Sequence, residues 1–383
     1  FRSIFGDSDQ LRYFSAPGRT EVGGNHTDHN HGKVLAASVN LDVIAVVEPT
    51  DDNIIKIKSE GFPEDSVDIS DLSVHENEKN SSAALIRGVA GGFKNNGLNI
   101  GGFRAYTTSN VMKGSGLSSS AAFEVLIGNI LSGIYNAGSI SAVKIAQIAQ
   151  YAENEYFGKP CGLMDQMACS VGGFVTIDFN DPKNPVIEEV DFDFAKCGHS
   201  LCIVDTKGSH SDLTDEYAAI RTEMESVAEF FGKKVLREVS EEEFKSKIRE
   251  LRTAVGDRAI LRAMHFYADN ARVLKEVDAL RGGDFETFKK YILESGASSY
   301  KYNQNVFSVK QPSVQPVSLA LAVSESILKG RGAWRVHGGG FAGTIQAFVP
   351  NDLLKDYKSI MESIFGEGTC YVLYIRPVGG TEI

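Results

Sequence analysis

The stretch GRTEVGGNHTDHNHG, residues 18–32, brings three of the eight histidines of the chain within six positions. His26, His29 and His31 at this spacing could ligate zinc. However, no other cysteine or histidine cluster in the sequence completes a tetrahedral set, and the HExxH helix pattern is absent. The interspersed glycines predict a loop instead, and its polar side chains suit a polyhydroxylated ligand. The side chains that could converge on such a ligand are Arg19, Asn25, His26, Asp28 and His29.

The stretch KGSGLSSSAAFEVLIGNIL, residues 113–131, places glycines and serines directly before apolar residues at helical spacing. Gly114 and Gly116 permit close approach of the backbone, and the N-terminus of the following helix directs its N–H groups and positive end to one point. This pattern predicts an anion cradle for phosphate. The alternative is a Ser-rich helix N-cap, for which any one serine would suffice. The stretch lacks the GK[ST] ending of a P-loop and the spacing of a G-x-S-x-G nucleophile elbow.

The stretch AENEYFGKPCGLMDQMACSVGG, residues 152–173, carries the acidic residues Glu153, Glu155 and Asp165. One carboxylate that ends a helix and another that opens the next could supply a metal ligand and a general base. A solvated helix face for Glu153 and an N-cap for Asp165 are the structural alternatives.

The stretch GGGFAG, residues 338–343, fits the G-x-G-x-x-G pattern of dinucleotide sites. The residues after it, TIQAFVP, predict a strand, whereas the dinucleotide fingerprint requires a helix there. We therefore expect the glycines to serve a close approach of the backbone to another element or to a ligand.

Composition excludes several classes of partner. The chain of 383 residues has a net charge of −11 and no basic run, so we expect small-molecule partners and neither nucleic acid nor an anionic membrane. Five cysteines without a CxxC pair predict reduced thiols in a cytoplasmic protein, and the first twenty residues do not resemble a signal peptide.

Periodicity predicts the elements that must position these residues. Strands are expected at 33–49, 53–59, 103–111, 173–179, 200–206, 333–350 around the glycine turn, and 369–377. Helices are expected after the serines at 122–134, at 145–152, and at 214–231, 240–255, 256–281, 285–296 and 314–328. The Asp- and Asn-containing run near 180 predicts a boundary between domains 1–180 and 181–383, and the whole reads as an α+β protein.

Together these stretches resemble the galactokinases of the GHMP family of small-molecule kinases. APGRTEVGGNHTDHNHG is similar to the galactokinase signature, in which an Arg precedes a Glu-His-Thr-Asp run. KGSGLSSSAA resembles the phosphate loop of the family, ENEYFGKPCGLMDQ the segment with the catalytic Asp, and RVHGGGFAG the third, glycine-rich motif. The four motifs follow the order of the family and span most of the chain.

The resemblance implies a two-domain GHMP kinase fold with the active site between an N-terminal domain that carries the phosphate loop and a C-terminal α+β domain. It implies transfer of the ATP γ-phosphoryl group to the anomeric hydroxyl of galactose with Mg²⁺, which requires in-line positioning, charge compensation and a proton acceptor.

The resemblance also assigns roles to residues. Asp165 would be the general base and Arg19 the adjacent cation, while Ser120 and Glu153 would bind magnesium. The residues implied to wrap ATP are Gly114, Ser115, Gly116, Leu117, Ser118, Ser119 and Ser120. Those implied to hold the sugar are Asn25, His26, Asp28, Gly162 and Tyr217. His29 and His31 would have structural or outer roles.

The sequence departs from the family pattern near the sugar. Asn25 stands where galactokinases usually have Glu, and Glu21 stands where Asn is commoner. Met112 and Lys113 replace the usual proline before the phosphate glycines, and SGASSYKYNQN, 295–305, replaces an acidic segment. Two alternatives to a galactokinase therefore stay open. One is a GHMP kinase for N-acetylgalactosamine, arabinose or a uronic acid, and the other is a sensor that binds sugar and ATP without chemistry.

Overall fold

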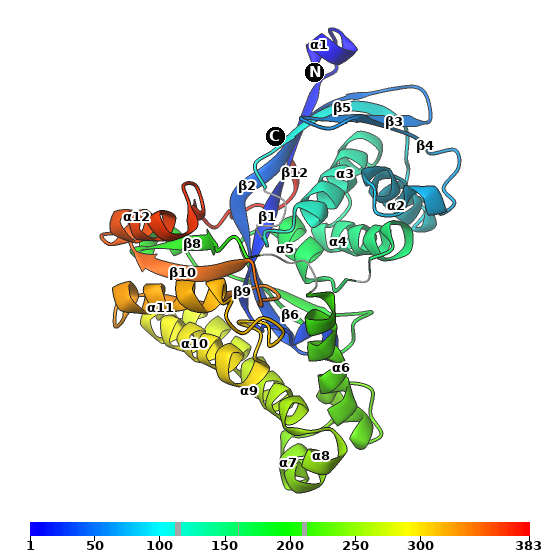
Figure 1. Cartoon of the computed structure of the whole chain (residues 1–383). Coiled ribbons are helices and arrows are strands. Elements are labelled where there is room, and N and C mark those ends of the chain that lie inside the picture. Colours follow the sequence, from blue (N-terminus) through cyan, green and yellow to red (C-terminus); the bar gives the residue numbers. More distant parts are fainter. Residues whose placement is uncertain (112–115, 160, 209–212) are drawn as a thin grey trace.

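The computed structural model describes residues 1–111, 116–159, 161–208 and 213–383, which form two β-sheets covered by helices (Figure 1). The larger sheet joins strands in the order β12-β1-β2-β5-β3-β4, with β6 paired to β2 and β7 paired to β6. Its strands are β1 (Arg12–Gly23), β2 (Lys33–Pro49), β3 (Ile54–Ser59), β4 (Glu64–Asp68), β5 (Phe103–Ser109), β6 (Phe174–Asp178), β7 (Val186–Val190) and β12 (Thr381–Glu382).

Four helices form a layer beside this larger sheet: α2 (Ser82–Asn95), α3 (Ser119–Tyr135), α4 (Ala142–Tyr151) and α5 (Met164–Val171). Of these, α3 and α5 pack on β1 and β2, α2 packs on β4, and α4 packs on the other three helices. The expected helix after the serines is confirmed as α3, whose Ala122, Val125, Leu126 and Ile130 are fully buried. Because α3 is apolar on most of its circumference, it lies at the centre of the helical layer and fixes the position of the loop before it. A short helix, α1 (Arg2–Phe5), lies at the N-terminal end (Figure 1).

The smaller sheet has the order β11-β8-β10-β9, from strands β8 (His199–Asp205), β9 (Ala333–His337), β10 (Thr344–Pro350) and β11 (Cys370–Leu373). Side chains of β8 alternate between two cores: Leu201 and Ile203 join the main core of the larger sheet, whereas Cys202 and Val204 face the core of α11. The helices of this half are α6 (Thr214–Phe230), α7 (Glu241–Ser246), α8 (Ile248–Ala254), α9 (Asp257–Arg281), α10 (Phe285–Ser298), α11 (Pro316–Leu328) and α12 (Leu354–Phe365).

Two sequence expectations require correction. Residues 18–32 do not form a loop throughout, because β1 continues to Gly23 and pairs with β2 across bulges at Pro17/Arg19 and Glu21/Gly23. The loop begins at Gly24 and includes a single turn of 3₁₀ helix, η1 (Asp28–Asn30). The expected helix at 240–255 is two helices, α7 and α8, that meet at Lys247.

The larger sheet draws strands from both sides of the expected domain boundary. Residues 179–185 connect β6 to β7 within this sheet, and β12 returns from the C-terminus to pair Glu382 with Phe14 of β1. The N-terminal sheet is therefore closed by the last residues of the chain, so the division at 180 does not coincide with the limit of the sheet.

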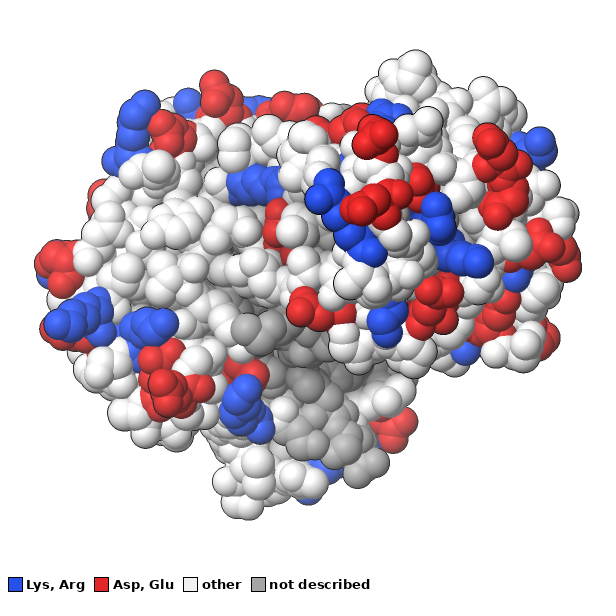
Figure 2. Space-filling view, turned by 90° about the horizontal axis from the view of Figure 1, so that it is seen from above, with Lys and Arg blue, Asp and Glu red and all other residues white. Residues whose placement is uncertain are grey.

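Charged side chains of both signs are interspersed among the described residues on the face drawn in Figure 2. In the described part of the chain, no helix combines the length and the apolar character needed to cross a bilayer.

Candidate active site

Arg19 and Asp165 form an ion pair where β1 meets the N-terminus of α5. Arg19 Nε lies 2.7 Å from Asp165 Oδ1. The guanidinium also donates to the Gly116 carbonyl, and the Arg19 backbone N–H donates to the Leu117 carbonyl over 3.1 Å. The strand bulge at Pro17/Arg19 thus brings one cation against both the expected base and the expected phosphate loop.

Both carboxylate oxygens of Asp165 accept a hydrogen bond, because Ser118 Oγ donates to Oδ2. Burial opposes ionisation of Asp165, but the Arg19 charge and the hydrogen bonds from Arg19 and Ser118 hold its pKa below the ordinary value. The side chain of Asp165 is 34% exposed, whereas that of Arg19 is 9% exposed. Asp165 is therefore an ionised carboxylate that a ligand can reach.

The described part of the phosphate loop has the backbone that an anion cradle needs. Gly116 has a φ of +73° and Ser118 a φ of +57°, so both lie in the left-handed region. Within the described residues, no side chain caps α3 and no acidic residue lies in its first turn. The N–H groups and positive end of α3 are thereby left for an anion. The expected contacts Gly114 and Ser115 lie outside the described residues.

Gly116 also lies against the glycine-rich motif. A Cβ on Gly116 would lie 3.1 Å from His337 Nδ1 and 3.2 Å from Thr344 Oγ1. Burial and the Arg19 charge lower the pKa of His337 well below its ordinary value, so its ring is neutral. His337 and Thr344, which flank the turn at 338–343, therefore lie close to the backbone of the phosphate loop at Gly116.

Glu153 lies on η3 (Ala152–Phe157), a π-helical segment that continues α4. Its Oε1 lies 3.4 Å from Ser120 Oγ and 3.2 Å from Lys159 Nζ, and its Oε2 accepts from Gln166 Nε2 over 2.6 Å. The structure therefore brings the two expected magnesium ligands, Ser120 and Glu153, together at the start of α3.

A second buried carboxyl lies behind Glu153. Glu124 on α3 accepts from the same Gln166 amide over 3.1 Å. Burial and the neighbouring Glu153 raise the pKa of Glu124 well above its ordinary value. The surroundings of Glu124 therefore favour its neutral form.

Four of the expected sugar residues line a partly exposed wall next to Asp165. Gly162 lies just before α5, the helix that carries Asp165, and a Cβ on Gly162 would lie 2.8 Å from Asp28 Oδ2. Tyr217, at the start of α6, donates its hydroxyl to the Gly340 carbonyl over 2.9 Å. His26 has a φ of +58°, and its Nε2 lies 3.0 Å from the Gly339 carbonyl. Because burial opposes ionisation of Asp28 more than His26 favours it, the pKa of Asp28 is raised.

Asn25 lies behind this wall and is fully buried. Its amide nitrogen donates to Glu21 Oε1 over 2.9 Å and to the Gly338 carbonyl over 2.8 Å. Its amide oxygen accepts from Ser299 Oγ and Asn305 Nδ2. A direct contact from Asn25 to a sugar stays a prediction, and it would require one of these four bonds to be exchanged.

Comparison with known families agrees with this geometry. Residues 1–49 match the galactokinase galactose-binding signature, and residues 84–173 match the N-terminal domain of GHMP kinases. The first match contains Arg19, His26 and Asp28, and the second contains the phosphate loop, Gly162 and Asp165. In these two segments, which hold most of the candidate site, the chain is similar to the GHMP kinases.

Solved structures of GHMP kinases share the fold of this chain. The galactokinase of Lactococcus lactis, solved with galactose, is 24% identical with a TM-score of 0.81 and covers 100% of this chain and 97% of its own. A D-glycero-D-manno-heptose 1-phosphate kinase from Bacteroides thetaiotaomicron is 16% identical with a TM-score of 0.65, covering 97% and 98%. The mevalonate kinase of Methanococcus jannaschii is 14% identical with a TM-score of 0.68, covering 96% and 99%. The expected two-domain fold is thereby confirmed.

Sequence patterns did not identify two residues that organise the candidate site. Gln166 bridges Glu153 and Glu124, and His337 links Thr20 to Thr344 beside Gly116. Their positions next to Asp165 and before the glycine turn are the only sequence signals that could have indicated them.

The residues present fit ATP and Mg²⁺, which GHMP kinases generally use. The uncapped N-terminus of α3 with Gly116 to Ser120 would hold phosphates, and Ser120 with Glu153 would hold the metal ion. Lys159 Nζ, which now neutralises Glu153, belongs to a side chain with 62% exposure, so it can move away when a divalent cation binds. Mg²⁺ bound here would offset the charge of the phosphates.

Proposed function

We propose that this GHMP kinase transfers the γ-phosphoryl group of ATP to the anomeric hydroxyl of galactose and releases galactose 1-phosphate and ADP. The observation that carries the proposal is the contact of Asp165 with Arg19 on one oxygen and with Ser118 of the phosphate loop on the other. A carboxylate held between the sugar signature and the phosphate loop is suited to accept a proton at the point where the two substrates meet.

In the proposed reaction, the anomeric oxygen of the sugar forms a bond to the γ-phosphorus while the bond from that phosphorus to the β,γ-bridging oxygen breaks. The hydroxyl proton moves to Asp165, and the electron pair of the broken bond leaves with ADP. Arg19 keeps Asp165 ionised before the step and stabilises the charge on the transferring group during it.

The proposed sugar contacts are His26, Asp28, Gly162 and Tyr217, with Asn25 directly behind them. Asp28 is the acidic side chain nearest Gly162, and its pKa is raised by burial, so a sugar hydroxyl that donates to it would favour its ionised form. The match of residues 1–49 to a galactose-binding signature supports galactose as the sugar. Five free thiols are consistent with action in the cytoplasm.

A related sugar is the second candidate, and Asn25 is the observation that favours it. A neutral, fully buried amide stands directly behind the sugar residues where galactokinases usually carry a carboxylate, and the Glu21 carboxylate lies 2.9 Å from it. A substrate such as N-acetylgalactosamine, arabinose or a uronic acid would differ from galactose at a substituent that such a change could accommodate.

The test is ADP release with MgATP against a panel of galactose, N-acetylgalactosamine, arabinose, galacturonic acid and glucose. We expect the highest kcat/KM for galactose, and ³¹P NMR should place the new phosphate on the anomeric oxygen. A clear preference for another sugar would replace galactose with that sugar. Binding of galactose and MgATP without ADP release would instead identify a sensor.

A further inference from the structure

Three successive carbonyls of the glycine turn accept hydrogen bonds from three side chains that the sequence assigned to the sugar. Asn25 donates to Gly338 over 2.8 Å, His26 Nε2 to Gly339 over 3.0 Å, and Tyr217 to Gly340 over 2.9 Å. Because a carbonyl oxygen only accepts, Nε2 of His26 carries the hydrogen. The glycine turn and the sugar wall are therefore one connected unit.

Asn25 differs from the other two side chains in this unit. An amide has two N–H donors and two acceptor lone pairs, and the four partners of Asn25 use all of them. Asn25 is also fully buried, whereas His26 and Tyr217 are partly exposed. A sugar can reach His26 and Tyr217 at the surface, while Asn25 has neither an exposed atom nor an unused hydrogen-bonding position.

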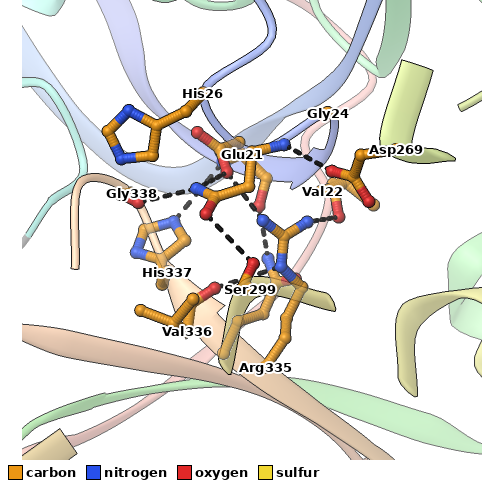
Figure 3. Close-up of polar contacts among 12 residues, drawn as sticks. Glu21, Val22, Gly24, His26, Asp269, Ser299, Arg335, Val336, His337 and Gly338 are labelled. Atoms are coloured by element: carbon orange, nitrogen blue, oxygen red, sulfur yellow. Dashed lines mark hydrogen bonds and ion pairs between the residues drawn. The ribbon is translucent and has the colours of Figure 1, made fainter. Parts of the chain in front are cut away.

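The orientation of the Asn25 amide is set by Glu21. Glu21 Oε1 accepts from Asn25 Nδ2 over 2.9 Å and from Arg335 Nη2 over 2.8 Å (Figure 3). A carboxylate only accepts hydrogen bonds, so it requires Asn25 to present its nitrogen to it and its oxygen to Ser299 and Asn305. The guanidinium of Arg335 compensates the buried charge of Glu21. It is held in place by the hydrogen bonds that it donates to the carbonyls of Val22 and Val336.

The turn that Asn25 fixes also borders the phosphate loop. His337 and Thr344, on either side of the turn, lie against Gly116, so a displacement of the turn would move the surroundings of both substrates. The carbonyl of Gly338 is the first of the three bonded carbonyls and directly follows His337. Fixing it therefore fixes the position of the His337 ring as well.

We propose that Asn25 and Glu21 are positioning residues that hold the glycine turn between the sugar site and the phosphate site, rather than residues that contact the sugar. This inference rests on the proposed function for the identity of the two sites. Its consequence is a coupling: disturbing Asn25 weakens sugar and nucleotide binding together, whereas loss of a direct sugar contact weakens sugar binding alone.

The first test is Asn25→Asp, which keeps the shape of the side chain, removes both N–H donors and places a second carboxyl beside Glu21. We expect KM for the sugar and the dissociation constant for MgATP to rise together, each by about tenfold. The matched control is Asn30→Asp. Asn30 is also fully buried in the same loop, but it bonds to the Leu236 N–H and His29 instead of the glycine turn. We expect this control to leave the MgATP dissociation constant within about twofold of wild type.

A rise in sugar KM alone, with unchanged MgATP binding, would overturn the proposal and make Asn25 a direct sugar ligand. Calorimetric titration with MgATP in the absence of sugar makes the nucleotide result independent of turnover. If the wild-type protein phosphorylated no sugar in the panel, the proposed function would fail, while the MgATP affinities of the two variants would still decide this inference.

Glu21→Gln provides a second test that does not depend on the folding of Asn25→Asp. The new amide keeps one acceptor but removes the charge. We therefore expect the sugar KM and the MgATP dissociation constant to rise together again, but by a smaller factor of about threefold. The double variant Glu21→Gln with Asn25→Asp restores one acid and one amide in reversed order. Its sugar KM and its MgATP dissociation constant should therefore both be lower than those of Asn25→Asp. If neither constant were lower than in Asn25→Asp, the proposal would be contradicted.

Discussion

Arg19 and Asp165, which stand 146 positions apart in the chain, meet with Nε 2.7 Å from Oδ1. The pair joins a strand of the sugar-signature region to the first turn of α5, and Gly116 of the phosphate loop accepts from the same guanidinium. The charge state of Asp165 and the position of the loop are thus controlled by one side chain. This pair is the basis of the first two predictions.

Asp165→Asn should lower turnover by about 10²-fold or more while preserving ATP binding, because general base catalysis commonly contributes 10² to 10⁴. The new amide keeps an acceptor for Arg19, so the loop should stay in place. Turnover is measured by ADP release and ATP binding by calorimetry.

Asp257→Asn is the matched control for this variant. Asp257 also opens a helix and also pairs with an arginine, Arg252, over 2.7 Å, but both side chains are 66% exposed and lie on the surface. Its turnover should equal that of the wild type. Near-normal turnover in Asp165→Asn would remove Asp165 from the proposed mechanism.

Arg19→Gln should move the acid limb of the kcat/KM profile to higher pH. A general base acts in its ionised form, so activity is lost as pH falls through its pKa, and Arg19 holds the pKa of Asp165 below the ordinary value. Without the cation, burial raises this pKa and the loss begins at a higher pH. The profile is measured over about pH 4 to 8. An acid limb at the wild-type position would show that Arg19 does not control the ionisation of Asp165.

Glu153→Gln should raise the Mg²⁺ concentration for half-maximal activity by about tenfold or more, because a neutral amide is a weaker ligand for a hard cation than a carboxylate. The comparison is Glu155→Gln, which changes the neighbouring acid in the same π-helical segment. Equal Mg²⁺ dependence in the two variants would exclude Glu153 as the metal-binding residue. The measurement is initial rate against free Mg²⁺ at fixed ATP.

Gly340→Ala should destabilise the glycine turn strongly. Gly340 has a φ of +83°, and an added Cβ would lie 1.9 Å from the backbone oxygen of Asn305. Gly330→Ala is the control, since Gly330 has a φ of +77° with nothing within 4 Å of an added Cβ. We expect a cost of about 1 kcal/mol in unfolding free energy for the control and roughly 3 kcal/mol for Gly340→Ala, measured by urea denaturation. Similar costs for both would mean that the turn tolerates a side chain.

Glu276→Gln should stabilise the protein at alkaline pH. Glu276 of α9 is fully buried, and within the described residues neither carboxyl oxygen has a hydrogen-bond partner. Burial, with Asp269 nearby, raises its pKa from 4.5 to about 8. Because this pKa is raised in the folded state, the neutral carboxyl favours folding at low pH, and that contribution is lost as pH rises toward and through about 8.

The glutamine variant lacks this titration, so its unfolding free energy at about pH 8 should exceed that of the wild type by roughly 2 kcal/mol, with a smaller difference at about pH 5. Urea denaturation at both pH values measures this. Glu286→Gln, on the exposed face of α10 at 81% side-chain exposure, should show no such difference. A pH-independent difference for Glu276→Gln would contradict the assignment.

Local sequence patterns were sufficient for most elements of the fold. The β-branched run 33–49 is strand β2 with the same bounds, and the apolar positions after the serines form α3, because periodicity reflects which face of an element is buried. Residues 18–23 were assigned to a loop because of their glycines. They form part of β1, because pairing with β2 across two bulges satisfies their backbone. That pairing is a long-range property that no local pattern contains.

The candidate site shows the same division. The types and order of the motifs predicted that Arg19, Asp165, Ser120 and Glu153 belong to one site, and the structure brings Arg19 to Asp165 and Ser120 to Glu153. The sequence could not indicate that Gln166 bridges two acids, or that Asn25 is enclosed by Glu21, Gly338, Ser299 and Asn305. These contacts join residues up to 313 positions apart, and burial decides whether each polar group is available to a ligand.

Residue types and short-range spacing were sufficient to predict the resemblance to GHMP kinases and the chemical groups of the candidate site, because they encode helix ends, turns and titratable side chains. The tertiary structure decided which of these groups face a ligand and which face one another. Asn25 and His26 are neighbours in the chain, yet the amide of Asn25 is saturated in the interior while His26 reaches the surface. The physical reason is that a buried polar group must find its hydrogen-bond partners within the protein, and only packing of distant segments determines where those partners lie.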